Sequence, residues 1–439
     1  MTELQAAVGT SAPPAVSRAA DRRRMIGICV GNFMEWFDFS VYGYFAVAIG
    51  AQFFPSGDST AEVLSSFAVF AVGFAARPVG ALVLGPIGDR KGRKALLQIT
   101  VIGMGISTTL MGLTPSYASI GIAAPILIVL LRCLQGMMAG SEWSSAAAYL
   151  VESAPEGRRA RRASLLTFSS GVAFMLGTLT ALLITSTMSE ESANTWGWRI
   201  PFVASAVTAL IAVYIRKKLE DTAVFHEVAR RRAAGTIEPV PWRVQARAVL
   251  LTVAFSALGS IGLYNLITYA NTHLAVTVGM PRSSALVVCM VSLVLYSCMH
   301  QFAGLLCDRW GRRPVALMAG VGLTVVGVPV YLLWDTGNVV LVLLGLVILA
   351  FFACCAAVIN VVVQVEVFPA SIRTRGSALG HNLCQSLIGG TAPLVSAALV
   401  AATGIAFSPG VYLAGIALLG TVLVWFMLPE TKHVDLVQG

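Results

Sequence analysis

Long apolar stretches alternate along this chain with short polar segments, most of them rich in arginine and lysine. The stretches have about the length of 20 residues with which a helix crosses the hydrocarbon core of a bilayer. The pattern predicts an all-α membrane protein with twelve spanning helices, six in each half. The predicted spans are residues 25–50, 62–87, 95–114, 120–150, 163–187, 199–218, 247–275, 283–306, 315–333, 338–366, 376–402 and 408–428.

A charged segment between the second and third spans recurs in the second half. Residues 85–94 read GPIGDRKGRK, and residues 304–313, which lie 219 positions later, read GLLCDRWGRR. A second pair, ESAPEGRRAR at 152–161 and EVFPASIRTR at 366–375, recurs at a shift of 214. Because both pairs keep one order and nearly one offset, we predict two pseudo-symmetric six-helix bundles, a parallel repeat known among transporters.

The repeat divides the chain into five predicted parts. They are an N-terminal tail (1–24), a first bundle (25–218), a linker (219–246), a second bundle (247–428) and a C-terminal tail (429–439). The linker mixes charged residues with a few apolar ones. Two interpretations stay open for it: a short amphipathic helix on the inner membrane surface, or a solvated connection.

Composition supports the membrane assignment, since 57% of the 439 residues are hydrophobic and only 12% are charged. The net charge of +9 does not indicate a nucleic-acid partner, because all but four of the 30 lysines and arginines lie in the tails, the linker and alternate turns. By the positive-inside rule both termini are expected in the cytoplasm. The eight cysteines form no CxxC pair or Cys/His cluster and are expected to be free thiols.

Five ionisable residues lie inside predicted spans of the first half: Glu35 and Asp38, Arg77, and Arg132 with Glu142. An unpaired charge at that depth costs several kcal/mol. The formal charges of these three acids and two bases sum to minus one, so one of the acids is expected to take up a proton. We predict a proton-coupling site of Asp38, Glu35, Arg132 and Glu142, with Asp38 as the carrier and Arg132 as its partner. The alternative is a static ion-pair network.

The second half carries uncharged polar residues at similar depth. Such groups suit substrate recognition when they face a cavity, although each alone could instead bond a neighbouring helix. No nucleophile–base pair, metal site or phosphate loop occurs, so we predict neither an enzyme nor a cofactor. The predicted substrate-binding residues are Arg77, Arg132, Tyr264, Asn265, Tyr269, Asn360, Asn382 and Gln385.

The repeated turns are expected to form a conformational latch. Gly88 is expected to end a helix and Gly92 to permit the chain reversal. Asp89 is expected either to accept hydrogen bonds from amides at the start of a neighbouring helix or to pair with an arginine of the turn at 155–162. A purely basic anchor is the alternative. The latch residues are Gly85, Asp89, Arg90, Gly92 and Arg93, with Gly304, Asp308, Arg309, Gly311 and Arg312 in the repeat.

The repeated turns resemble the loop signature of the major facilitator superfamily, and Arg132, Gln135 and Gly136 resemble its fourth-helix signature. The segments GNFMEWFDFSVYG, WGWRIPF and KLEDTAVF resemble the metabolite:proton symporter family, and the similarity runs from about residue 27 to 428. One departure is the sequence Gly-Ser-Glu-Trp-Ser at 140–144, where that family has Gly-Gly-Glu-Trp/Tyr-Gly.

The resemblance implies a two-bundle carrier in the bacterial inner membrane that moves a small organic acid or zwitterion together with protons. The first four spans are nearest to proline/betaine transporters. The implied partners are a small-molecule substrate, protons and the lipid bilayer, without nucleic acid, and the protein is expected to be a monomer driven by the proton gradient. An exporter, a uniporter and a non-transporting membrane sensor are the alternatives.

Overall fold

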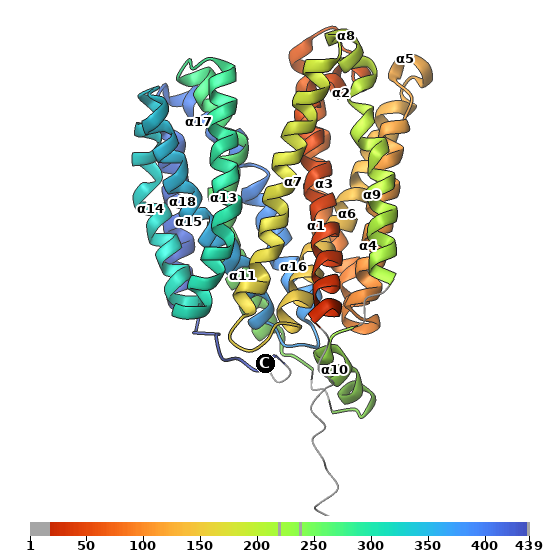
Figure 1. Cartoon of the computed structure of the whole chain (residues 1–439), viewed down its shortest axis with the longest axis vertical. Coiled ribbons are helices and arrows are strands. Elements are labelled where there is room, and N and C mark those ends of the chain that lie inside the picture. The colour runs from red at the N-terminus through yellow and green to blue at the C-terminus, as the bar shows by residue number, and fades with distance from the viewer. Residues whose placement is uncertain (1–17, 218–220, 237–238, 437–439) are drawn as a thin grey trace, which may run out of the picture.

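The computed structural model describes residues 18–217, 221–236 and 239–436, and every regular element in these ranges is a helix. Most of the predicted N-terminal tail, residues 1–17, lies outside the described residues. The helices form two groups that stand side by side, one from each half of the chain (Figure 1). The predicted fold class of two six-helix bundles is therefore confirmed.

Ten helical elements make up the first half. The first two, α1 and α2, together form its first span. They are α1 (Arg18–Tyr44), α2 (Ala46–Phe53), α3 (Ser59–Lys91), α4 (Arg93–Leu113), α5 (Tyr117–Ile120), α6 (Ala123–Glu152), α7 (Arg159–Thr187), α8 (Glu190–Ser192), η1 (Ala193–Gly197) and α9 (Arg199–Lys217).

The second half repeats the arrangement with two interrupted spans, in which short π-helices replace regular α-helix. Such irregular turns often occur at functional sites. The elements are α11 (Trp242–Tyr264), η2 (Asn265–Tyr269), α12 (Ala270–Thr272), η3 (His273–Thr277), α13 (Arg282–Trp310), α14 (Arg312–Asp335), α15 (Val339–Glu366), α16 (Arg373–Cys384), η4 (Gln385–Gly389), α17 (Ala392–Thr403) and α18 (Ser408–Met427).

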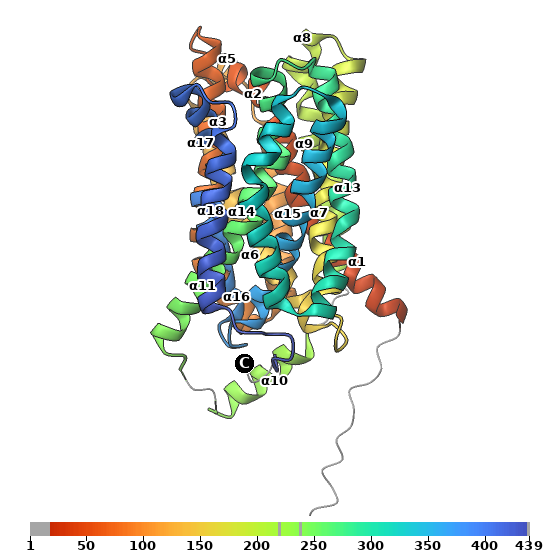
Figure 2. The ribbon, with the colours of Figure 1, turned by 90° about the vertical axis from the view of Figure 1, so that its left-hand side faces the viewer.

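Both halves are joined through α10 (Ala223–Ala233), which lies at the same end of the molecule as the start of α1 and the end of the described chain (Figures 1 and 2). We call the end of the molecule at which α10 lies the basic end, and the opposite end the far end. Val224 and Val228 of α10 are buried. On the solvated side of α10, hydrogen bonds from Arg230 and Arg231 lower the pKa of Glu227. The linker therefore contains an amphipathic helix that packs on the protein.

The close packing of α3 on α6 depends on glycines. A Cβ added at Gly136 would lie 2.0 Å from the carbonyl oxygen of Gly73, and one added at Gly140 would lie 2.1 Å from that of Arg77. No side chain fits at either position, so the GxxxG spacing brings the two backbones into direct contact. This contact places Arg77 and Arg132 side by side in the interior of the first bundle.

The predicted chain reversal at Gly92 is confirmed, since its φ of 101° lies in the region that favours glycine, and Gly311 repeats it with 103°. The prediction for Gly88 is wrong. Helix α3 continues past Gly88 to Lys91, and the glycine instead makes room for Leu96 and Thr374, which a Cβ would approach to 2.7 and 3.0 Å.

Candidate transport site

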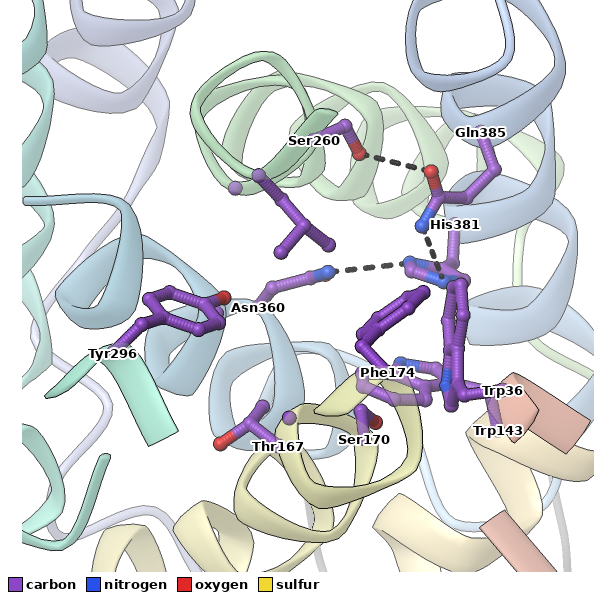
Figure 3. A pocket seen from close by; sticks show the side chains of 14 residues that line it. Trp36, Trp143, Thr167, Ser170, Phe174, Ser260, Tyr296, Asn360, His381 and Gln385 are labelled. Atoms are coloured by element: carbon purple, nitrogen blue, oxygen red, sulfur yellow. Dashed lines mark hydrogen bonds between the residues drawn. The ribbon is translucent and has the colours of Figure 1, made fainter. Parts of the chain in front are cut away.

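A cavity lies between the two halves, with walls from α1, α6 and α7 on one side and from α11, α13, α15, α16 and η4 on the other (Figure 3). Side chains of both bundles therefore contribute to one site. The lining residues are Trp36, Trp143, Thr167, Ser170, Gly171, Phe174, Gly259, Ser260, Leu263, Tyr296, Ala357, Asn360, His381 and Gln385. We call this space the inner cavity.

Aromatic rings form much of its wall on the side of the first bundle. The ring centroids of Trp36 and Trp143 are 5.9 Å apart and their planes meet at 85°. Phe174 lies 5.4 Å from Trp36. Tyr296 approaches the cavity from α13 on the opposite side (Figure 3). The sequence analysis did not assign these rings to a site, because aromatic residues in apolar spans are as typical of lipid-facing surfaces as of cavity walls.

His381 connects the polar side chains of the second bundle. Its Nδ1 lies 3.3 Å from Asn360 Nδ2, and its Nε2 lies 3.4 Å from Gln385 Nε2. Ser260 donates a hydrogen bond of 3.1 Å to Gln385 Oε1 (Figure 3). The histidine ring also stacks on Trp143, with centroids 5.4 Å apart. The sequence assigned no role to His381, yet it links the polar wall to the aromatic wall.

A second, larger space lies toward the far end and is lined mainly by apolar and aromatic residues of both halves. Trp36 and Phe174 belong to its lining and to that of the inner cavity. These two rings therefore separate the spaces. We call the second one the outer cavity; Tyr44, Phe70, Tyr264 and Asn271 are among its lining residues.

Glu35 and Arg77 form a buried ion pair behind the aromatic wall. Their side chains are fully buried, and Glu35 Oε1 lies 3.0 Å from Arg77 Nη2. The guanidinium also lies over aromatic rings, 4.5 Å from the centroid of Phe39 and 4.7 Å from that of Phe74. This stacking compensates in part for the loss of water around the charge.

Asp38 lies in a different environment from Glu35, although both are on α1. Its two carboxylate oxygens accept hydrogen bonds from Thr108 (2.6 Å) and Ser205 (2.8 Å). Gln135 donates to Thr108 at 2.8 Å and accepts a hydrogen bond from Arg132. Arg132 is thus connected to Asp38 through two intervening side chains. In the described part of the chain it forms no ion pair with Glu35 or Asp38.

Glu142 is paired with a residue that the sequence did not identify. Arg216, at the end of α9, is fully buried and forms an ion pair with Glu142, which also accepts a hydrogen bond from Thr100. The predicted net charge of minus one is therefore wrong. Arg216 lies in a run of basic residues that reads as linker, and its long side chain reaches back into the bundle.

The predicted substrate-binding residues separate into two groups. Asn360 and Gln385 line the inner cavity, and Tyr264 lines the outer one. The other five line neither cavity. Asn265 accepts a hydrogen bond from Tyr331, and Tyr269 packs against His273 and Tyr331. Asn382 donates to the carbonyl oxygens of Gly140 and Ala378, and Arg77 and Arg132 lie over aromatic rings of the first bundle.

Asp89 contacts the other half of the molecule at the basic end. Its carboxylate accepts hydrogen bonds from the backbone amides of Thr374 (3.0 Å) and Arg375 (3.3 Å), which lie in the first turn of α16. It also pairs with Arg93 at 3.2 Å. A helix N-terminus favours a carboxylate at this position. Of the two predicted partners, the helix amides are therefore correct and an arginine of the turn at 155–162 is not.

Asp308 makes the equivalent contact in the opposite direction. It accepts hydrogen bonds from the amides of Ala160 (2.9 Å) and Arg161 (3.0 Å), at the start of α7, and lies 3.4 Å from Arg312. Arg90 and Arg309, the basic residues that follow the two aspartates, are exposed. The repeat in sequence is thus a repeat of contacts between the halves.

Two buried glutamates extend these contacts. Glu152 pairs with Arg93 in its own half and with Arg373 in the other half, at 3.2 and 2.9 Å. Glu366 pairs in the same way with Arg312 (2.8 Å) and with Arg159 across the interface (3.5 Å).

The C-terminal segment covers the same region. The carbonyl oxygens of Val434 and Leu436 accept hydrogen bonds from Arg159 and Arg373, both 2.8 Å long.

Two repeated bundles, a cavity between them and ion pairs that join them at one end are typical of a membrane transporter. The sequence profile of the sugar (and other) transporter family matches residues 25–238 and 237–438. The chain belongs to this family of transporters, and the predicted membership of the major facilitator superfamily is confirmed.

Several relatives match nearly the whole chain. The proline/betaine transporter of Salmonella typhimurium is 33% identical over 91% of this chain and 82% of its own length. The ectoine/proline transporter of Corynebacterium glutamicum is 33% identical over 92% of this chain and 84% of its own length. An inner membrane metabolite transport protein of Escherichia coli is 34% identical over 94% of this chain and 95% of its own length. These similarities support a multi-pass transporter of the inner membrane.

Solved structures show the same fold. A proton:xylose symporter of the major facilitator superfamily superposes with a TM-score of 0.81 and covers 96% of this chain and 98% of its own, at 17% sequence identity. A partially occluded, inward-open structure of the Escherichia coli xylose transporter gives a TM-score of 0.73, at 16% identity.

Proposed function

We propose that this chain is a proton-coupled symporter that imports a small zwitterion or organic acid by alternating access. The buried ionisable groups beside a cavity shared by both bundles support this proposal, because such groups in membrane spans mark ion and substrate pathways. The relatives are named for proline, betaine and ectoine, which are small zwitterions. These names narrow the expected substrates to that group.

One observation carries the proton coupling. Asp38 is buried, and among the described residues no arginine or lysine forms an ion pair with it. A buried carboxylate without an ion-pair partner keeps much of its desolvation cost, which binding of a proton removes. Other buried carboxylates of the described spans do have an arginine partner; these are Glu35, Asp89, Glu142, Glu152, Asp308 and Glu366.

Arg132 is the proposed counter-charge for the deprotonated state. Its Nε and Nη2 atoms have no hydrogen-bond partner, and Gln135 and Thr108 connect it to Asp38. We propose that loss of the proton draws Arg132 toward Asp38 and tightens this part of the first bundle. Glu35 and Glu142 are weaker candidates for the carrier because Arg77 and Arg216 already neutralise them.

The contacts at the basic end would act as the latch of the transport cycle. Asp89 and Asp308 each join the two halves, so opening a path at this end requires both to separate. The positive-inside rule places the basic end in the cytoplasm. In this proposal the latch stabilises the state that is closed toward the cytoplasm, and substrate release requires it to break.

Uptake by proteoliposomes that contain the purified full chain tests this function. A labelled panel of proline, glycine betaine, citrate, 2-oxoglutarate, shikimate and benzoate would be offered with and without an imposed pH gradient, acid outside. We expect one or more of these compounds to accumulate only with the gradient, and a protonophore to abolish the accumulation. Uptake that merely equilibrates, with or without the gradient, would identify a uniporter instead.

A further inference from the structure

We propose that Trp36, Trp143, Phe174 and Tyr296 form an aromatic cage for the ammonium group of the substrate. The cage would select zwitterions with a substituted ammonium group over dicarboxylates and tricarboxylates. This inference rests on the proposed function, because it assumes that substrate occupies the inner cavity. It goes further in naming the substrate class and the side chains that select it.

The charge of the cavity wall carries the first step. Among its lining residues, which all belong to the described part of the chain, none is an aspartate, glutamate, lysine or arginine. The nearby Arg77 is neutralised by Glu35 at 3.0 Å. A multivalent anion would enter this space without a compensating cation, and the loss of its water would be uncompensated. A zwitterion has no net charge, so this wall suits it better.

The rings provide the attraction for the positive group. A quaternary or secondary ammonium is attracted to the face of an aromatic ring, most strongly to tryptophan, and a cage of such rings is the usual means of binding it. Cations already occupy neighbouring rings of this cluster: Arg77 lies 5.4 Å from the centroid of Trp36, and Arg132 lies 4.2 Å from that of Phe39. The inner cavity presents Trp36 together with three further rings, Trp143, Phe174 and Tyr296, around one space.

Two buried donors provide for the negative group. The indole Nε1–H groups of Trp36 and Trp143 have no hydrogen-bond partner, although the two residues are only 3% and 5% exposed. Buried donors are almost always bonded. The indoles of Trp198 and Trp334 are also unpaired but line neither cavity, whereas Trp36 and Trp143 line the inner cavity, where a bound ligand would bring acceptor atoms next to them. A carboxylate supplies such atoms and would satisfy both indoles.

The two indoles are adjacent in the cavity wall. Their ring centroids are 5.9 Å apart and their planes meet at 85°, so an edge of one ring is directed at the other ring. Donors for a carboxylate and a ring face for an ammonium therefore belong to neighbouring side chains. This arrangement fits zwitterions whose two charged groups are separated by one carbon, as in proline and glycine betaine.

A pair of isosteric probes tests the cage directly. Glycine betaine and 3,3-dimethylbutanoate have the same shape and the same carboxylate, but the second has a carbon atom in place of the ammonium nitrogen. Both would compete against labelled glycine betaine in proteoliposomes of the full chain. We expect the carbon analogue to compete at least about thirty-fold more weakly. Competition within about three-fold of glycine betaine would overturn the cage.

Substitutions at Trp143 give a graded test. The half-saturating concentration of glycine betaine is expected to rise from wild type to Trp143→Phe to Trp143→Leu, by about ten-fold or more for leucine. Inhibition by the carbon analogue is expected to weaken less, because this analogue shares only the carboxylate contact with the indole and not the contact between the ammonium and the ring. Trp196→Leu is the matched control, because Trp196 is 61% exposed and lies outside the cavity. If Trp143→Leu does not fold, Phe174→Leu replaces it, and the half-saturating concentration of glycine betaine is again expected to rise relative to wild type. Equal affinities across the series would contradict the cage.

Failure of the cage differs from failure of the proposed function. Accumulation of citrate or 2-oxoglutarate under a pH gradient, without accumulation of glycine betaine or proline, would support proton symport and overturn the cage. Gradient-independent uptake of glycine betaine that the carbon analogue does not inhibit would support the cage and overturn proton coupling. Absence of uptake of every compound in the panel would overturn both.

Discussion

Arg132 differs from the other buried arginines of the first bundle in having no carboxylate partner among the described residues. Arg77 and Arg216 pair with Glu35 and Glu142. The Arg132 guanidinium instead donates to Gln135 and lies over three rings, 4.2 to 5.0 Å from their centroids. A planar group is required for both kinds of contact, so its chemistry at this position depends on more than its charge.

Arg132→Lys is therefore expected to reduce concentrative uptake at least about ten-fold, because an ammonium group cannot donate and stack in this geometry. Initial rates in proteoliposomes under a fixed pH gradient would measure the effect. Arg243→Lys, near the start of α11, is the control and should keep the wild-type rate. Wild-type rate and affinity in Arg132→Ala would show that Arg132 takes no part in coupling.

A second prediction at this scale concerns Gly136. A methyl group there would meet the carbonyl oxygen of Gly73, so Gly136→Ala is expected to separate α3 from α6 and to destabilise the protein by about 1–3 kcal/mol. Gly415→Ala is the matched control, since no atom lies within 4 Å of its added Cβ. Thermal denaturation in detergent, followed by size-exclusion chromatography, would compare them. Equal midpoints would refute the close packing.

At the scale of elements, the start of α16 and the start of α7 are two equivalent points at which the bundles meet. Asp89 and Asp308 accept hydrogen bonds there from amides of the opposite half. Each contact combines a full negative charge with the positive end of a helix. The two contacts are equivalent by the internal repeat, so they are expected to act in the same sense.

Asp89→Asn and Asp308→Asn should each shift the equilibrium toward the state open at the basic end, by about 1–3 kcal/mol. A cysteine in place of Ser144, which is fully buried and donates to Gln364 of the other half, would report the opening through labelling by a maleimide in a cysteine-free background. Asp58→Asn, near the far end, serves as the control. Unchanged labelling in both latch variants would refute the latch.

For the whole molecule, the sequence predicted the architecture well because its signals are long or repeated. Apolar length predicted the spans, and the duplicated turns predicted two equivalent bundles. Helix amides were one of two partners predicted for Asp89, and the structure shows that they are the correct one. Ion pairs that depend on the direction of a long side chain were not predicted. Arg216 belongs to a basic run by sequence but pairs with Glu142 inside the bundle. Trp143 and His381 line the cavity, although neither ring was predicted to bind substrate.

Coupling to one proton would make the molecule an effective concentrator. A potential of 100 mV contributes about 2.3 kcal/mol per charge and one pH unit about 1.4 kcal/mol, which together correspond to about 500-fold accumulation of a neutral zwitterion. This advantage depends on a group that binds a proton from one side and releases it to the other. In the present account that group is Asp38.

The most direct test compares two transport modes of Asp38→Asn in proteoliposomes. Asparagine keeps the size of the side chain; its amide oxygen can accept from one of the hydroxyls of Thr108 and Ser205 and its NH2 group can donate to the other, but it cannot carry a proton. Ser40→Ala, also buried on α1, is the control for a polar change nearby. We expect the asparagine variant to lose accumulation driven by a pH gradient and to retain exchange of labelled for unlabelled substrate. Accumulation at the wild-type level would contradict Asp38 as the proton carrier.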